Sequence, residues 1–417
     1  MADNFTYLFL AALALSILIR IWLARRHIRH VLAHRAAVPA GFAERIPLAA
    51  HQKAADYTAA RVRFGFVGLA VETALLLALT LGGGLAALSA FWSGHLAGLW
   101  HGLALILSVL AISGAVDIPL NAWRQFVIEQ RFGFNRMTPA LFVTDLVKTA
   151  LLGTAIGTPL ILAVLWLMGA MGERWWLYVW GFWCAFNLLI LFVYPTWIAP
   201  LFNKFSPLAE GETKTRIEAL LARCGFRSGG LFVMDGSKRS AHGNAYFTGF
   251  GNTKRIVFFD TLLERLKAEE IEAVLAHELG HFRHRHVQKR IALMFAVSLA
   301  FLALLGQLID APWFFAGLGV SDAAGHGQAM ALILFFLALP AFTFPLTPLG
   351  SLLSRRNEFE ADRYAAAHAR SDDLVQALVK LYEDNAATLT PDPLHSLFYD
   401  SHPPAAIRIA RLQQAGA

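Results

Sequence analysis

Two histidines four residues apart, with a glutamate beside the first, form the densest group of potential metal ligands in this sequence. In the segment VLAHELGHFRHRH, residues 274–286, they are His277, Glu278 and His281. In a helix, both imidazoles lie on one face, one turn apart, and both can reach one metal ion. Glu278 lies on a different side, where it can accept a proton from a water that the metal polarises. The pattern predicts a catalytic zinc site, although so short a motif also occurs by chance.

A catalytic zinc site needs a third protein ligand and an open position for water. A third histidine at position 287 is excluded, because that residue is a valine. Between His281 and Glu358 there is no other glutamate, and the two aspartates of that interval, Asp310 and Asp322, are expected at the far side of the membrane. Glu358 is therefore the predicted third ligand.

The helix expected around Glu358 carries two further acids, in the segment SRRNEFEADRYA. Asp362 follows one turn later on the same face, where its carboxylate can hold a ligand histidine through the second ring nitrogen. Glu360 points elsewhere on the helix, so its loss is not expected to affect the metal. Taken alone, the acids could equally form a solvated face paired with Arg355 and Arg356.

The bulk composition is that of a chain that lies mostly in lipid. Of 417 residues, 57% are hydrophobic and only 16% charged, with a mean hydropathy of +0.51, whereas about a quarter of a soluble domain is charged. The net charge of +7 is explained by arginines that flank an apolar run, so no nucleic-acid partner is expected. Seven stretches are long enough to cross a ~30 Å hydrocarbon core: roughly 5–24, 65–90, 98–120, 149–171, 175–196, 290–310 and 329–351.

The spans divide the chain into four regions. They are five N-terminal spans (1–196), a polar segment with the HExxH motif (197–289), two further spans (290–351) and a second polar segment (352–417). Lysine and arginine asymmetry places the N-terminus outside and both polar segments in the cytosol, as one shared site requires. Glu72 and Asp117, inside spans, are expected to pack against partners, with a water-filled interior as the alternative.

The first polar segment is expected to be mainly helical with a small β element. Residues 214–226 (KTRIEALLARCGF) predict a helix that ends at Gly225, and 255–263 (RIVFFDTLL) a strand that runs into a helix. Residues 268–286 predict one continuous helix, so His284 and His286 are interpreted as residues near its C-terminus rather than as ligands. The fold class is an all-α polytopic membrane protein with a helical cytosolic domain.

Further motifs carry a family resemblance. The HExxH, RSAHGNAYFTGF (239–250), EFEAD (358–362) and SHPPAAIR (401–408) together resemble the CAAX prenyl protease family of type I CAAX endopeptidases. Segments 129–148 and 195–208 also resemble membrane-proximal motifs of that family. The resemblance runs from the second span to the C-terminus, and we expect a bacterial-type member. It implies seven helices that enclose a chamber, with one Zn²⁺ per chain at the cytosolic end.

The resemblance also implies roles for residues that spacing alone does not single out. His402 would stabilise the oxyanion, although a histidine before a proline is on its own an ordinary loop residue. Asn244, Ala245 and Tyr246 would form an edge strand that pairs with the substrate backbone. Arg408 would contact substrate, or could equally be a structural partner for a buried acid.

The expected function is hydrolysis of peptide bonds near the membrane–cytosol boundary, of the CAAX type by resemblance. Zinc polarises a water, Glu278 takes its proton and returns it to the leaving amine, and His402 stabilises the oxyanion. The expected partners are a peptide or protein substrate, lipidated or membrane-associated, and the bilayer of the plasma or inner membrane, with the enzyme a monomer. The alternatives are a general quality-control metalloprotease, a metal transporter and a non-catalytic zinc scaffold.

Overall fold

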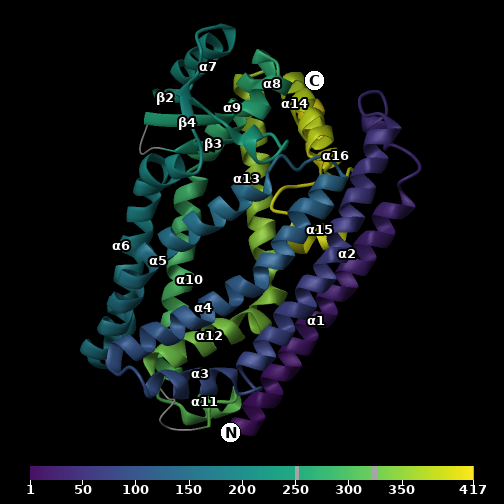
Figure 1. Ribbon diagram of the computed structural model, residues 1–417. Helices are drawn as coiled ribbons and strands as arrows, with labels where there is room; N and C mark the ends of the chain where they lie inside the picture. The colour runs from purple at the N-terminus through teal and green to yellow at the C-terminus, as the bar shows by residue number, and fades with distance from the viewer. Residues whose placement is uncertain (249–252, 322–326, 417) are drawn as a thin grey trace.

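The computed structural model is a tall bundle of long helices with a small sheet and several shorter helices at one end (Figure 1). The structure describes residues 1–248, 253–321 and 327–416. Asp322 and the last two residues of the 239–250 motif lie outside the described residues.

Seven helical segments within the described ranges are long and apolar enough to cross a bilayer, which confirms the predicted number of spans. They are Ala2–Ala33 (α1), Leu48–Leu79 (α2), Gly98–Glu129 (α4 and its π-helical end), Pro139–Ala170 (α5), Gly172–Leu201 (which contains α6, Trp175–Val193), His286–Leu308 (α10) and Gln328–His368 (α12, Gln328–Thr343, with α13, Thr347–His368).

The predicted bounds of the second span, 65–90, are wrong. Helix α2 ends at Leu79, and a separate short helix, α3 (Gly84–Ser93), follows. Three glycines at 82–84 separate the two helices, and Gly83 has φ +77°, a left-handed conformation that ends a helix without strain in glycine. The span instead begins earlier, at Leu48.

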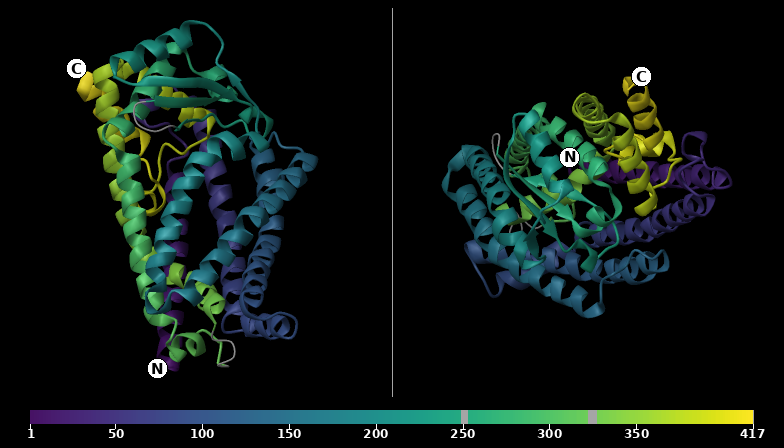
Figure 2. Two further views of the ribbon diagram at one scale, coloured as in Figure 1. Left: turned by 90° about the vertical axis from the view of Figure 1, so that its left-hand side faces the viewer. Right: turned by 90° about the horizontal axis from the view of Figure 1, so that it is seen from above.

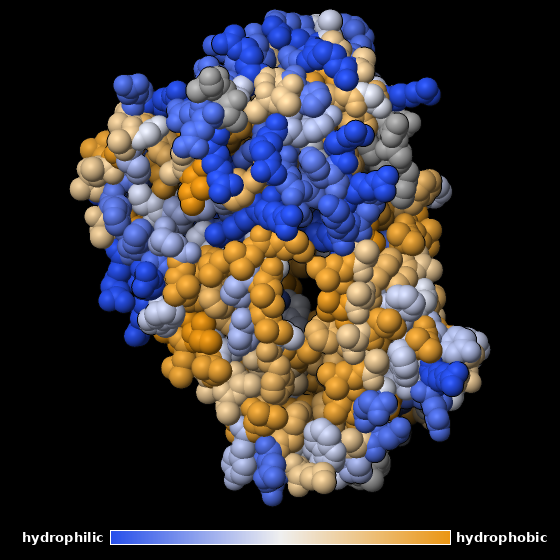
Figure 3. Space-filling view, turned by 180° about the vertical axis from the view of Figure 1, so that it is seen from behind, coloured by the Kyte–Doolittle hydropathy of each residue, from blue (hydrophilic) through white to orange (hydrophobic). Residues whose placement is uncertain are grey.

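A cavity of about 1200 Å³ lies inside the bundle and reaches the polar end. Glu72 of α2 and Asp117 of α4 line it and are exposed to it, so the expectation that they pack against partners is wrong. A cavity lined by these acids is what the alternative of a water-filled interior requires, because an acid is tolerated at membrane depth where it faces water. Figure 3 shows the broad apolar band that surrounds this interior, with an opening through it.

The predicted β element is a four-stranded sheet in the order β1-β2-β4-β3. Its strands are Phe205–Pro207 (β1), Arg227–Met234 (β2), Ala245–Thr248 (β3) and Thr253–Phe259 (β4). Strands β2 and β4 run parallel, while β1 and β3 pair antiparallel at the two edges. As predicted, β4 continues directly into a helix, α8 (Asp260–Arg265), and α7 (Glu212–Arg223) ends just before Gly225.

Helix α9 (Ala268–Arg283) is the element that joins the sheet to the membrane bundle. The Glu270 carboxylate accepts a hydrogen bond from the Lys267 backbone N–H and so caps its first turn. Ile271, Leu275 and Leu279, four residues apart, are buried in one core with the sheet and the helices α7, α14 (Ser371–Asp384) and α16 (Ala405–Gly416). This apolar stripe fixes how α9 is rotated, and therefore which way its histidines point.

The two polar segments meet at the same end of the bundle, opposite the N-terminus (Figure 2). Of the C-terminal helices, α13 and α14 pack against α9, and α16 packs against both of them, whereas α15 (Pro393–Tyr399) packs against α13 and α1 (Figure 1). This confirms the expectation that the two polar segments share one side.

Candidate metal centre

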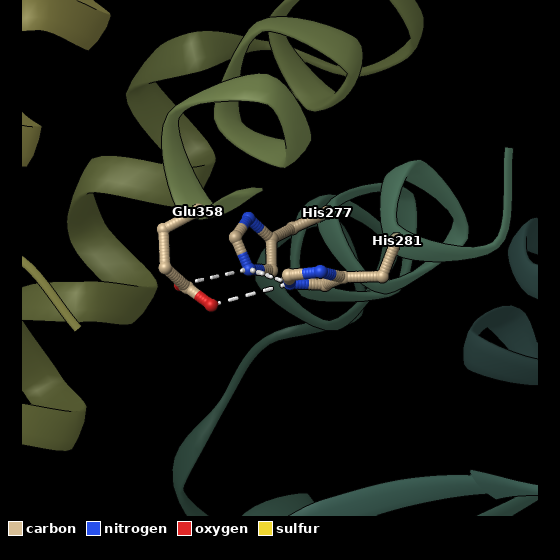
Figure 4. Close-up of side chains that lie close together, drawn as sticks. All are labelled: His277, His281 and Glu358. Atoms are coloured by element: carbon tan, nitrogen blue, oxygen red, sulfur yellow. Dashed lines mark hydrogen bonds and ion pairs between the residues drawn. The ribbon is translucent and has the colours of Figure 1, made fainter. Parts of the chain in front are cut away.

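Helices α9 and α13 bring the three predicted ligands together. His277 and His281 lie one turn apart on α9 and face Glu358 on α13 (Figure 4). The two Nε2 atoms are 3.3 Å apart, His277 Nε2 is 3.5 Å from Glu358 Oε2, and His281 Nε2 is 3.4 Å from Glu358 Oε1. Atoms held tetrahedrally at the usual zinc distance of about 2.0–2.1 Å lie about 3.3–3.4 Å from one another. The two Nε2 atoms are therefore spaced as two corners of a zinc coordination tetrahedron, and each lies at a similar distance from one oxygen of the Glu358 carboxylate.

Glu358 also carries an atom that a cation would satisfy. Its side chain is buried, 4% exposed, and among the described residues Oε2 has no hydrogen-bond partner. A buried carboxylate oxygen without a partner is costly, whereas a bound cation removes that cost. Two imidazoles and one carboxylate are a ligand set that suits zinc, with a fourth position left for water.

Asp362 makes the contact that its position on the helix predicts. Its Oδ1 lies 2.9 Å from His277 Nδ1. In the neutral ring the N–H sits on Nδ1 and donates to Asp362, so Nε2 can bind a metal once it has lost its own proton. Burial by itself lowers the pKa of His277, but hydrogen bonds to Asp362 and Glu358 outweigh it and raise the pKa to about 9.

Arg408 lies behind the ligands and is only 5% exposed. Its guanidinium donates two hydrogen bonds to Asp362, of 2.6 and 2.9 Å, and Nη1 lies 3.6 Å from Glu358 Oε2. The positive charge of the Arg408 guanidinium thus balances two buried carboxylates. This placement favours the alternative that Arg408 is a structural partner over the predicted contact with substrate.

Glu278 and His402 are the two residues predicted to act on the reacting groups. Glu278 is partly buried, and no hydrogen bond or ion pair occupies its carboxylate within the described part of the chain. His402 lines the cavity, with Nε2 3.5 Å from Glu358 Oε1 and Nδ1 3.0 Å from Ser401 Oγ. The cavity walls partly desolvate the ring and lower the pKa of His402, which favours a neutral imidazole.

The segment that the resemblance assigns to substrate binding lies at the sheet edge. Asn244 is exposed and lines the same cavity as His402. Ala245 and Tyr246 begin β3 and pair with Phe258 and Val257 of β4. Because β3 is the last strand in the sheet order, its outer edge pairs with no other strand among the described residues. Ala245 and Tyr246 therefore lie in an edge strand as predicted, whereas Asn244 precedes it, and pairing of this edge with a substrate stays a prediction.

The structure shows two contacts that the sequence interpretation missed. The prediction of one helix through residue 286 is wrong, because α9 ends at Arg283 and α10 begins at His286. His286 folds back so that its Nδ1 lies 3.0 Å from His281 Nδ1, and its Nε2 lies 3.0 Å from Glu360. Glu360 does point away from Glu358, but it reaches this histidine. The cluster of histidines was the available signal, and the assumption of a straight helix hid it.

Comparisons with known proteins agree with this arrangement. The family description "CAAX prenyl protease N-terminal, five membrane helices" matches residues 27–204, and "Peptidase family M48" matches residues 207–415. The chain is 38% identical to the CAAX prenyl protease 1 homolog of Oryza sativa, over 76% of this chain and 74% of that protein. It is 36% identical to CAAX prenyl protease 1 of Saccharomyces cerevisiae, over 72% and 70% respectively.

The crystal structure of S. mikatae Ste24p resembles this chain with a TM-score of 0.88 and 30% identity, over 97% of this chain and 98% of that one. Fold, site and comparisons define an integral-membrane metalloendopeptidase. The chain belongs to peptidase family M48, in its CAAX prenyl protease branch. These relatives are eukaryotic, and they leave the expectation of a bacterial-type member untested.

Proposed function

We propose that this chain binds one Zn²⁺ through His277, His281 and Glu358 and removes C-terminal residues from lipidated, CAAX-type protein substrates. The observation that carries the proposal is the convergence of two imidazole Nε2 atoms and one carboxylate, with contacts of 3.3–3.5 Å, beside a cavity of about 1200 Å³. The substrate class follows the printed names of the relatives, which are CAAX prenyl proteases.

Bound zinc supplies Lewis-acid polarisation of a water and of the scissile carbonyl. Glu278 accepts the proton of the attacking water, because it follows the ligand His277 in the chain and no hydrogen bond or ion pair occupies its carboxylate among the described residues. It then delivers that proton to the leaving amine. His402 donates a hydrogen bond from Nε2 to the carbonyl oxygen as negative charge develops there. The Glu358 carboxylate, 3.5 Å from Nε2, can only accept and favours the tautomer with its N–H on Nε2, to which the Ser401 hydroxyl at Nδ1 can adapt by donating.

The cleaved peptide binds as an added strand. The outer edge of β3 offers backbone N–H and C=O groups, and the exposed Asn244 side chain lies beside the cavity. Strand addition suits an extended C-terminal tail, because backbone hydrogen bonds hold it regardless of sequence. The cavity is larger than a usual small-molecule pocket of about 300–1,000 Å³, which leaves room for a lipid-modified residue.

The site faces the cytosol in this proposal, and the N-terminus lies outside. The support is the excess of lysine and arginine in the two polar segments and around their spans. The membrane is the plasma or inner membrane, where cytosolic proteins with lipidated tails can reach the cavity from the bilayer. One chain supplies all three proposed ligands and the edge strand, so the working unit is a monomer.

The test is Glu278→Gln, with zinc content and cleavage measured on one preparation. The variant should keep its zinc, because Glu278 is not a ligand, and should lose about 10²–10⁴-fold in turnover of a farnesylated CAAX peptide. The same peptide with serine in place of the modified cysteine serves as the substrate control. Normal turnover in the variant would refute the role of Glu278. Equal cleavage of both peptides by the unaltered enzyme would refute the substrate class.

A further inference from the structure

The turn between α9 and α10 carries a buried histidine that the proposed mechanism does not use. Arg285 adopts a left-handed conformation, with φ +57°, that interrupts the helix before α10 begins. The turn folds His286 back onto the ligand helix, where it is 4% exposed and its Nδ1 lies 3.0 Å from His281 Nδ1. A positive φ in a non-glycine residue costs free energy, so the surrounding structure must favour this turn.

The far end of His286 determines which atoms carry hydrogen in this contact. Its Nε2 lies 3.0 Å from Glu360 Oε2 on α13. A carboxylate only accepts hydrogen bonds, so the hydrogen-bond pattern assigns the His286 proton to Nε2 and leaves Nδ1 as an acceptor. The His281 Nδ1–H then donates to His286, and the Nε2 lone pair of His281 is directed at the other ligands.

We propose that His286 and Glu360 are positioning residues that hold His281 in the tautomer and orientation that bind metal. This inference rests on the proposed ligand set. It makes His281 the counterpart of His277, whose Nδ1 is held directly by Asp362. Ligand histidines generally donate their second N–H to a carboxylate or another acceptor, and that contact fixes the ring. All three acids of the EFEAD motif then act at the metal centre, one as ligand and two as supports.

The rival explanation is that His286 only fills space. Its ring stacks on that of His284, with centroids 5.5 Å apart and planes at 15°, and it is buried. Two substitutions separate packing from hydrogen bonding. His286→Phe keeps an aromatic ring but offers His281 no acceptor. His286→Asn loses the ring but places an amide oxygen near the position of Nδ1.

The experiment uses the full chain in detergent and measures zinc affinity by competition with a chelator, together with the absorption spectrum of the Co²⁺-loaded protein. His286→Phe should lower zinc affinity about 10- to 100-fold and change the Co²⁺ spectrum, and His286→Asn should lose clearly less. Glu360→Ala should also weaken binding. Arg356→Ala is the matched control, because Arg356 is 79% exposed and bonds only the other oxygen of Glu360, at 3.3 Å. It should leave affinity unchanged.

Equal losses in the Phe and Asn variants, or no loss in the Phe variant, would overturn the inference. The same holds if Arg356→Ala weakens binding as much as Glu360→Ala. If neither His286 variant folds, the Glu360 and Arg356 pair decides the question, because both side chains lie nearer the surface. His281→Ala separates the two proposals. Retained zinc in that variant refutes the ligand set, whereas lost zinc with an unaffected His286→Phe refutes only the positioning role.

Discussion

Replacing Gly280 by alanine should damage the metal centre without changing any ligand. Gly280 precedes His281 on α9, at the point where α9 packs closest against α13. A Cβ at this position would lie 2.9 Å from Ala361 Cα and 3.0 Å from Tyr364 Cβ. Carbon atoms in contact normally lie about 3.5–4.0 Å apart, so the two helices would have to separate by about 0.6–1 Å.

The size of the effect follows from where this separation acts. Ala361 lies between Glu358 and Asp362, so the shift moves the third ligand and the support of His277 away from α9. Metal sites tolerate deviations of only about 0.2 Å in ligand distance. Overpacking of a core costs about 1–3 kcal/mol. If the metal-bound form bears that strain, zinc affinity falls about 5- to 140-fold, because 1.4 kcal/mol corresponds to a factor of ten.

Zinc competition and thermal unfolding of the metal-free protein measure the two sides of this prediction. The free energy of unfolding should change by less than the free energy of zinc binding. The reason is that alanine is favoured over glycine in a helix by about 1 kcal/mol, which offsets part of the strain. Gly350→Ala in α13 is the control, since a Cβ there meets no atom within 4 Å. Wild-type zinc affinity in Gly280→Ala, or equal losses in both variants, would show that the close approach of the helices does not set the ligand geometry.

Three further predictions concern the ligands, their protons and the topology. Asp362→Ala should weaken zinc binding about 10- to 100-fold, and Glu358→Ala should weaken it more, since that change removes a ligand. Zinc content of both variants tests this ranking, and a larger loss in Asp362→Ala would contradict it. Because its carboxylate partners outweigh burial and raise the pKa of His277 to about 9, that histidine is protonated at pH 7. Zinc binding at pH 7 should therefore release about one proton, and the zinc affinity should increase as the pH rises towards 9. Calorimetry in buffers of different ionisation enthalpy measures the proton release. Zinc binding without proton release would be evidence against the prediction. Single cysteines at positions 321 and 372, in a variant without the native cysteines, test the topology: impermeant reagent on intact cells should label the first and spare the second, and labelling of the second would reverse the orientation.

Regular periodicity explains how much of the site the sequence could predict. A spacing of four residues puts His277 and His281 on one helix face wherever α9 is straight, and a long interval without other glutamates singled out Glu358. Span number likewise follows from hydropathy, because an apolar stretch of sufficient length has few other stable environments. These inferences need only local geometry and the thickness of a membrane.

Irregular backbone explains what the sequence could not predict. The left-handed conformation of Arg285 is unfavourable for a residue with a Cβ, so sequence propensity argues for continuing the helix. Tertiary packing overrides that preference, and only then does His286 meet His281 and Glu360. Hydropathy also gives no information about what Glu72 and Asp117 face, because a span that lines a cavity contains the same residues as one packed in a bundle.

The packing around the ligands supports the geometry of the metal centre. Helix contacts hold α9 and α13 together, since the close approach at Gly280 and Ala361 leaves no room even for a methyl group. Arg408 balances the buried carboxylates of Glu358 and Asp362, so the protein itself supplies part of the charge that a cation would provide. Small zinc domains, in contrast, fold only when the metal binds, because they lack such a core. Ligands that are held by helix packing and by supporting side chains require little binding free energy for ordering when a metal binds.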